Sequence, residues 1–149
     1  MTRTFYLISH PNVVISRDVP VPRWPLSERG RARMRAGLQQ LWVKDVVAIY
    51  SSTEQKAMDG AGILGEHRSL PFTPIHELGE NDRSATGFLP GEEFERVSHG
   101  AVGTLLYCHL TGQAISRRWD QPPNGGGNWF RFTLTPREAF GGWQPLDGL

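Results

Sequence analysis

Four side chains that could act on an anion stand where elements of the fold are expected to begin or end. His10 directly follows the apolar run TFYLIS, and Ser51 and Ser52 close the run DVVAIYSS. His99 stands just before the apolar stretch AVGTLL. An imidazole can serve as a nucleophile or an acid–base group, and the N–H groups at a helix start suit a phosphate. The pattern therefore favours chemistry on a phosphate-like group.

The elements that must position these residues follow from the hydrophobic pattern. Compact runs of β-forming residues predict strands at 4–9, 45–52 and 128–135, with a weaker extended segment at 70–78. Helical spacing predicts helices at 28–42, 53–67 and 101–112. Strands that alternate with helices indicate a three-layer α/β/α fold with a mostly parallel central sheet. Ligands of such sheets bind beyond the carboxyl ends of the strands, where His10 and Ser52 fall.

The first predicted helix is amphipathic. Ser27 is its expected N-cap, and an apolar stripe recurs at helical spacing through Met34, Leu38 and Leu41. The arginines at positions 29, 31, 33 and 35 fall on the other faces. We therefore expect a surface helix whose apolar stripe faces the core.

Length and composition indicate a single domain over residues 1–149. The chain has 149 residues, of which 38% are hydrophobic, enough for one core of ordinary size. A formal net charge of +1 gives no reason to expect nucleic acid or a membrane as partner. The single cysteine, Cys108, excludes an internal disulfide, and no apolar run approaches the ~18 residues of a membrane span. We expect a cytoplasmic protein.

Each candidate residue also has a purely structural explanation. A histidine after a strand is more often a loop residue than a catalyst, and the sequence SHG before a helix can be only an N-cap. Lys56 on a short helix is usually a solvated charge, and Glu80 is usually a turn carboxylate. His67, His76 and His109 show no i, i+4 pair and no cysteine partner, so a structural zinc site is not expected.

Five segments, taken in order, resemble the landmarks of one known family. They are YLISHPNVV, PLSERGRARMRAGLQQL, VVAIYSSTEQKAMDGAGIL, LGENDRSATG and VSHGAVGTLL, and the resemblance covers nearly the whole chain. The most specific are PLSERGRARM, the YSS strand end with a basic residue four places beyond Ser52, and VSHG. In order and spacing they are similar to the histidine phosphatase superfamily, whose fold is phosphoglycerate mutase-like.

The resemblance implies a site for phosphoryl transfer. His10 would be the nucleophile that forms a phosphohistidine, and His99 would donate to the phosphoryl oxygens from across the pocket. Glu80 matches the acid that protonates the leaving oxygen and then activates water. No metal or other cofactor is implied, because a side chain attacks and protein donors meet the charge.

The partner implied by the resemblance is a small phosphorylated substrate or an inorganic oxyanion. The residues expected to contact it are Ser9, Ser52, Lys56 and Arg83. Two of these replace arginines of the family pattern: the Arg-His-Gly signature is Ser-His-Pro here, with Ser9 at the arginine, and Lys56 stands at the second arginine. Lysine lacks the bidentate contact of arginine, and serine carries no charge. Losing one donor aimed at transition-state charge costs ~3 kcal/mol, on the order of a hundredfold in rate.

The sequence therefore leaves two functions open. Hydrolysis of a phosphomonoester is favoured by the presence of His10, His99 and Glu80. A weak or inactive member that binds a phosphorylated ligand or protein partner in the same pocket is favoured by the two lost arginines. A mutase acting on phosphorylated sugars or glycerate is disfavoured by the short chain.

The segment before His99 is too short and too polar for the strand expected there. Between Gly91 and Val97 the sequence GEEFERV leaves no room for a strand, nor for the crossover of about a dozen residues that parallel strands need. Either the helix and strand that the family carries at this point have been lost, or the chain has a break here. We expect a break between Glu92 and Val97, with Val97 as the stub of a longer strand.

Overall fold

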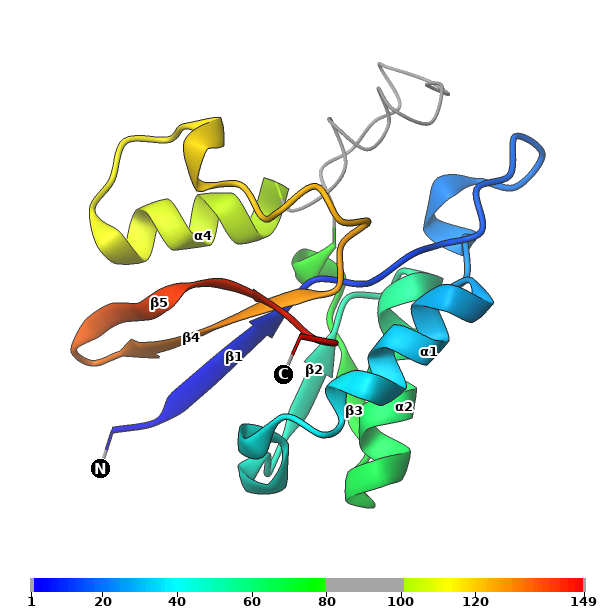
Figure 1. The fold of residues 1–149 in the computed structure, drawn as a ribbon, viewed down its shortest axis with the longest axis horizontal. Helices are drawn as coiled ribbons and strands as arrows, with labels where there is room; N and C mark the ends of the chain where they lie inside the picture. Colours follow the sequence, from blue (N-terminus) through cyan, green and yellow to red (C-terminus); the bar gives the residue numbers. More distant parts are fainter. Residues whose placement is uncertain (1, 80–100, 149) are drawn as a thin grey trace. The chain divides into compact units, whose positions relative to one another are not determined.

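The computed structural model describes residues 2–79 and 101–148 (Figure 1). The chain divides into two compact units. Unit 1 comprises Met1–Ser9 and Glu80–Pro145, and unit 2 comprises His10–Gly79 and Leu146–Leu149. The chain therefore enters unit 2 directly before His10 and again directly before Leu146.

Unit 1 is built on a three-stranded antiparallel sheet in the order β1-β4-β5. Its elements are β1 (Thr4–Ile8), α4 (Ala101–Thr111), the short 3-10 helix η4 (Arg117–Trp119), β4 (Asn128–Leu134) and β5 (Arg137–Pro145). α4 packs on one face of the sheet around Leu110, Phe130 and Phe132 (Figure 1). Aromatic rings fill this core: Phe130 and Trp143 meet edge to face, with centroids 4.9 Å apart.

Unit 2 contains two helices and a two-stranded parallel sheet. Its main elements are α1 (Glu28–Gly37), β2 (Ile49–Ser51), α2 (Gln55–Arg68) and β3 (Phe72–Pro74). Its 3-10 helices are η1 (Val21–Arg23), η2 (Leu41–Asp45) and η3 (His76–Leu78). α2 forms the crossover from β2 to β3, and α1 packs against α2 (Figure 1). The start of α2 therefore lies at the carboxyl edge of this sheet.

The expected mostly parallel sheet is only partly confirmed by the described strands. β2 and β3 are parallel, whereas β1, β4 and β5 pair antiparallel. β4 and β5 are joined by only two residues, 135 and 136, and so short a connection permits only antiparallel pairing. β5 was not among the predicted strands, because its burial does not alternate regularly and two adjacent glycines interrupt it.

Three predicted elements are shorter in the structure, among them the weak extended segment at 70–78, of which β3 covers only three residues. α1 ends at Gly37 rather than at residue 42, and Leu41 is 85% exposed instead of lying in the apolar stripe. Beyond α1 the chain turns into η2, which buries Trp42 and Val43 instead. β2 covers only three residues, and Val47 before it is 83% exposed.

Four other predicted elements are confirmed to within two residues at each end, among them the strand predicted at 4–9, which corresponds to β1. The helices predicted at 53–67 and 101–112 correspond to α2 and α4, and the strand predicted at 128–135 corresponds to β4. Within the described ranges, no helix is long and apolar enough to span a bilayer.

Candidate active site

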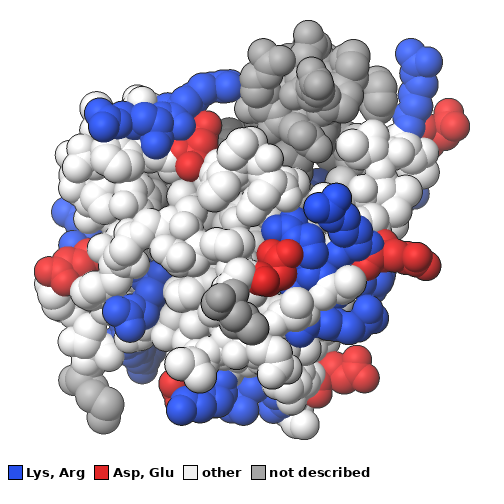
Figure 2. Space-filling model, viewed as in Figure 1, with Lys and Arg blue, Asp and Glu red and all other residues white. Residues whose placement is uncertain are grey.

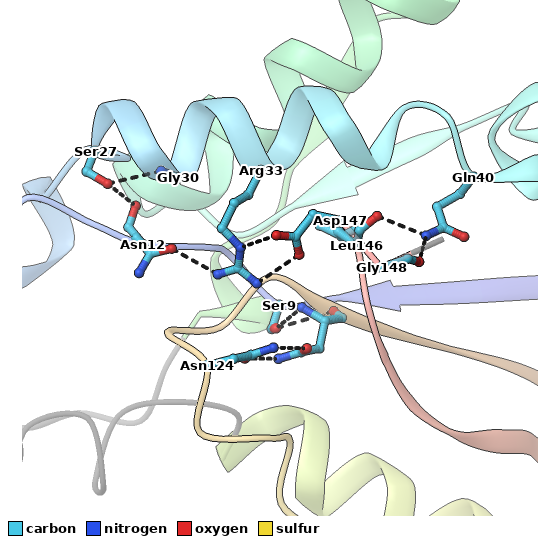
Figure 3. A network of polar contacts seen from close by, with 11 residues as sticks. Ser9, Asn12, Ser27, Gly30, Arg33, Gln40, Asn124, Leu146, Asp147 and Gly148 are labelled. Atoms are coloured by element: carbon cyan, nitrogen blue, oxygen red, sulfur yellow. Dashed lines mark hydrogen bonds and ion pairs between the residues drawn. The ribbon is translucent and has the colours of Figure 1, made fainter.

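Ser9, at the end of β1, belongs to a network of neutral side chains in unit 1 (Figure 3). Its Oγ donates to Oε1 of Gln121 at 2.5 Å and accepts from the backbone N–H of Asn128 at 3.0 Å. Asn128 is fully buried and also donates from Nδ2 to Oε1 of Gln121 at 2.8 Å. The side-chain amide of Asn124 faces that of Asn128. At the position where the resemblance implies an arginine, this chain therefore has a hydroxyl that is engaged with amides.

His10 is the first residue of unit 2, and its ring contacts its own loop. Nδ1 of the half-buried imidazole lies 2.9 Å from the carbonyl oxygen of Pro11, which is itself buried. A carbonyl oxygen can only accept a hydrogen bond, so this contact requires the N–H to be on Nδ1. In the neutral ring, Nε2 is then the nitrogen with the lone pair.

Asn12 fastens the same loop to the start of α1 (Figure 3). Its backbone oxygen accepts from the N–H of Ser27 at 2.9 Å and from Oγ of Ser27 at 3.2 Å. Ser27 is the N-cap predicted from the sequence, and its Oγ accepts from the N–H of Gly30 at 3.0 Å. A Cβ atom added at Gly30 would lie much closer than 3.0 Å to the Asn12 backbone oxygen, and real Cβ atoms essentially never make contacts that short. The loop can approach α1 this closely only because residue 30 is glycine.

Arg33 is a buried cation that joins Asn12 to Asp147 (Figure 3). Its Nη1 donates to Oδ1 of Asn12 at 2.9 Å. Its Nε and Nη2 donate to the two carboxylate oxygens of Asp147 at 3.1 and 3.2 Å, a bidentate pair. These hydrogen bonds hold the pKa of Asp147 below its ordinary value of 3.8. The chain around Asp147 is fixed as well, because Nε2 of Gln40 donates to the carbonyls of Leu146 and Gly148 at 2.9 and 3.1 Å.

A second arginine of α1 is also paired within unit 2. Nη2 of Arg31 lies 3.1 Å from Oδ2 of Asp59 on α2. On the face shown in Figure 2, the basic side chains over α1 lie beside acidic ones. The charges of Arg31 and Arg33 are therefore both met by carboxylates of their own unit.

The chain after β2 combines buried hydroxyls with a buried cation. Ser51 and Ser52 are buried, and Oγ of Ser52 accepts from the N–H of Glu54 at 3.3 Å. Lys56 lies in the first turn of α2 with only 1% of its surface exposed, and its Nζ is 3.5 Å from Oε1 of Glu54. Lysine is almost never buried so deeply without a partner, so the interpretation of Lys56 as a solvated charge is wrong. Its ammonium group and the α2 N-terminus carry positive charge of the kind that binds a phosphate.

Four of the predicted site residues lie next to strand ends in the structure. Ser9 and His10 follow β1, and Ser52 and Lys56 follow β2. The other predicted site residues, Glu80, Arg83 and His99, lie outside the described residues. So do the predicted cleft between the two histidines and the predicted break between positions 92 and 97.

Sequence reasoning missed the side chains that hold the loop carrying His10. It assigned Arg33 to a solvent-facing side of the first helix, whereas the structure buries it. One local signal was available: Gly30 and Gly37 lie three residues before and four residues after Arg33, on the same helix face. Two glycines on the same helix face as a cation indicate that other parts of the chain pack closely there: the Asn12 backbone at Gly30 and the Leu146 side chain at Gly37. No comparable signal marks Gln121 or Asn128.

Comparison with known proteins assigns the chain to a family. The family model described as Histidine phosphatase superfamily (branch 1) matches residues 6–96. The chain belongs to this superfamily, as the sequence motifs predicted. A search of curated proteins gave no match.

Solved structures show the same fold at low sequence identity. A mycobacterial glucosyl-3-phosphoglycerate phosphatase in complex with inorganic phosphate is 14% identical over 99% of this chain and 100% of its own, with a TM-score of 0.72. Bacillus stearothermophilus YhfR is 19% identical over 92% of this chain and 94% of its own, with a TM-score of 0.65. Mycobacterial hydrolase 2 is 16% identical over 89% of this chain and 82% of its own, also with a TM-score of 0.65. The structural likeness therefore concerns the fold.

Proposed function

We propose that the chain hydrolyses a phosphomonoester through a phosphohistidine formed on His10. The observation that carries the proposal is the contact of 2.9 Å between Nδ1 of His10 and the Pro11 carbonyl. It assigns the proton to Nδ1 and leaves the lone pair on Nε2, the nitrogen that can attack phosphorus. Membership of the superfamily and the likeness to a phosphatase that binds inorganic phosphate support the same reaction.

The proposed reaction has two steps. In the first, Nε2 of His10 attacks phosphorus in line with the ester oxygen, so that the N–P bond forms as the P–O bond to the leaving group breaks. Glu80, which matches the acid of the family, gives its proton to the departing oxygen. In the second step the Glu80 carboxylate takes a proton from water, whose oxygen attacks phosphorus. The N–P bond breaks, inorganic phosphate leaves, and both side chains return to their starting forms.

The phosphoryl charge would be met mainly by Lys56 and by N–H groups at the start of α2. By resemblance, His99 donates from across the pocket, and Ser52 and Arg83 are further residues that we expect to contact the phosphoryl group. Because Ser9 replaces one family arginine, we expect turnover to be slower by on the order of a hundredfold than with an arginine at position 9.

A second function, binding without turnover, is favoured by the network around Ser9. The Ser9 hydroxyl is engaged with Gln121 and Asn128, all neutral groups, so the residue at the arginine position brings no charge to a transition state. A site that keeps a buried cation at Lys56 can still hold a phosphorylated ligand or protein partner.

Steady-state assays on a panel of phosphomonoesters test these two functions. His10→Ala is compared with His67→Ala, a matched control because His67 is exposed on α2. We expect slow turnover that His10→Ala abolishes and His67→Ala leaves unchanged, with an acid-labile phosphoenzyme only where His10 is present. Turnover that survives His10→Ala contradicts the proposed nucleophile. Absence of turnover together with tight binding of phosphate or vanadate would establish the binding function instead.

A further inference from the structure

One face of α1 joins two segments that are distant in the sequence. Gly30, Arg33 and Gly37 recur at spacings of three and four residues and so share that face. Gly30 meets the backbone of Asn12, and Arg33 reaches Asn12 on one side and Asp147 on the other. Gly37 leaves room for the side chain of Leu146, the residue before Asp147. The face therefore connects the loop that carries His10 to residues 146–148.

The face of α1 is connected to His10 through the peptide unit between Pro11 and Asn12. Asn12 is held by the N–H and Oγ of Ser27 and by Nη1 of Arg33. The Asn12 nitrogen and the Pro11 carbonyl belong to the same planar peptide unit, so fixing Asn12 limits the direction of that carbonyl. The Pro11 ring also fixes its own φ. This carbonyl is the group that accepts from Nδ1 of His10.

The hydrogen bond from Arg33 to Asn12 depends on Asp147. The side chain of Arg33 is only 8% exposed, and a buried guanidinium must be paired. Asp147 supplies two parallel hydrogen bonds to it. Without that carboxylate the buried charge loses its bidentate partner, and the guanidinium must turn toward water or another acceptor. The hydrogen bond from Arg33 to Asn12 would then be lost or distorted.

We propose that Arg33 and Asp147 are positioning residues for His10, acting through Asn12 and the Pro11 carbonyl to keep Nε2 as the unprotonated ring nitrogen. The inference rests on the proposed role of His10 as nucleophile. Neither residue contacts the reacting atoms in this scheme. Their contribution is to the population of the reactive tautomer and to the direction of the ring.

The first test measures the His10 tautomer by NMR of the 15N-labelled protein at alkaline pH, where imidazoles are neutral. The His10 resonances are assigned by comparison with His10→Ala. We expect the wild type to be almost entirely Nδ1-protonated and Asp147→Ala to show a mixture with the Nε2-protonated form. Added formate, a small carboxylate that can occupy the vacated place beside Arg33, should restore the wild-type ratio. If Asp147→Ala does not fold, Arg33→Lys provides the same test.

The second test separates kcat from KM with a phosphomonoester. Misplaced nucleophiles lose rate more than affinity, so Asp147→Ala and Arg33→Lys should each lower kcat about tenfold and change KM little. Formate should raise kcat of Asp147→Ala and leave the wild type unaffected. Arg31→Lys is the matched control, because it alters an ion pair of the same helix that does not include Asn12. It should leave both kcat and the tautomer ratio unchanged.

The outcomes distinguish this inference from the proposed function. If the wild type turns over and both Asp147→Ala and Arg33→Lys keep the wild-type tautomer ratio and kcat, the inference is overturned and the hydrolytic function stands. If the wild type shows no turnover, the hydrolytic function fails and the NMR measurement still decides the positioning. An unchanged tautomer ratio then overturns the inference, and a ratio that formate restores supports it.

Discussion

Two loops of unit 2 that follow strands are stabilised in opposite ways. The β1 loop (residues 10–12) is held by hydrogen bonds to its backbone and to Asn12, and the cation behind it, Arg33, is neutralised by Asp147. The β2 loop (residues 51–56) includes the start of α2 and buries Lys56, whose carboxylate neighbour Glu54 is 3.5 Å away. In the β1 loop, geometry is fixed with little net charge. In the β2 loop, the buried cation and its carboxylate neighbour both belong to the loop itself.

This difference bears on Ser9 and Lys56, the two positions at which the chain departs from the pattern that the resemblance implies. In the proposed reaction His10 needs a fixed ring direction, which hydrogen bonds to the backbone can supply without a guanidinium at position 9. The proposed phosphate binding needs positive charge, which Lys56 would supply even though it lacks the bidentate geometry of arginine. Four experiments, with five substitutions, test this division between geometry and charge.

The largest effect is expected at Lys56. Lys56→Met removes the buried charge of the β2 loop at similar side-chain length, and affinity for phosphate or vanadate should fall by about a hundredfold, as for loss of one charged donor. Isothermal titration calorimetry measures this affinity. Lys44→Met, at an exposed lysine of η2, should leave it unchanged. Equal affinities in Lys56→Met and the wild type would show that another group supplies the charge that binds the anion. That result would contradict the role given to the β2 loop.

Gly30→Ala should be the most damaging small change at the β1 loop. The added methyl group would overlap the Asn12 backbone oxygen, so we expect a loss of about 2 kcal/mol in the free energy of unfolding. Urea denaturation measures it. Gly62→Ala is the control, because its Cβ would lie 3.9 Å from Cε1 of Phe72, an ordinary contact. That change should stabilise α2 by up to ~1 kcal/mol. Similar values for the two variants would show that the loop moves away from α1 easily.

A pair of serine substitutions compares the two loops directly. Ser27→Ala removes the N-cap of α1 and one donor to Asn12, and should cost about 1–2 kcal/mol of unfolding free energy. Ser52→Ala removes an acceptor of a longer hydrogen bond, 3.3 Å from the Glu54 nitrogen, and should cost about half as much. Thermal and urea unfolding give both values. A larger loss of unfolding free energy for Ser52→Ala would show that the β2 loop, and not the β1 loop, is the more firmly held.

The smallest effect is a pH dependence at Asp147. Its pKa is lowered in the folded state by hydrogen bonds from Arg33, so the ion pair stabilises the fold above the ordinary pKa of 3.8. That contribution is lost as the pH falls below 3.8 through the lowered folded-state pKa. The difference in unfolding free energy between the wild type and Asp147→Asn should therefore be constant near neutrality and shrink on acidification. Since the Asp147 side chain is 36% exposed, solvent screening keeps the change modest. A difference that grew toward acid pH would contradict the direction of the shift.

Local chemistry made part of this structure predictable. Ser27 was identified as a cap because a hydroxyl stands just before helical periodicity, and the structure confirms it. The position of His10 beyond β1 followed from an apolar run that ends at Ser9. These features depend only on neighbours in the sequence, where propensity and pattern carry most of the information.

The residues that hold the β1 loop could not be predicted, because their partners are distant in the sequence. Arg33 and Asp147 are 114 positions apart, and nothing near either residue indicates the other. The same holds for Ser9 and Asn128, separated by 119 positions. A lone arginine on an amphipathic helix is assigned to solvent by default, since its charge is costly to bury without a partner. The antiparallel partners of β1 on β4 are likewise 121 to 129 positions away in the sequence.

The contacts on α1 differ in what they require of related sequences. Gly30 faces a backbone oxygen, which every residue at position 12 possesses, so no substitution at position 12 can relieve a side chain at position 30. Relatives that keep this loop should therefore have glycine there whatever residue 12 is. Arg33 and Asp147 meet through side chains, and a change in one can be offset by a change in the other. Across relatives, position 30 should be invariant by itself, whereas positions 33 and 147 should vary together.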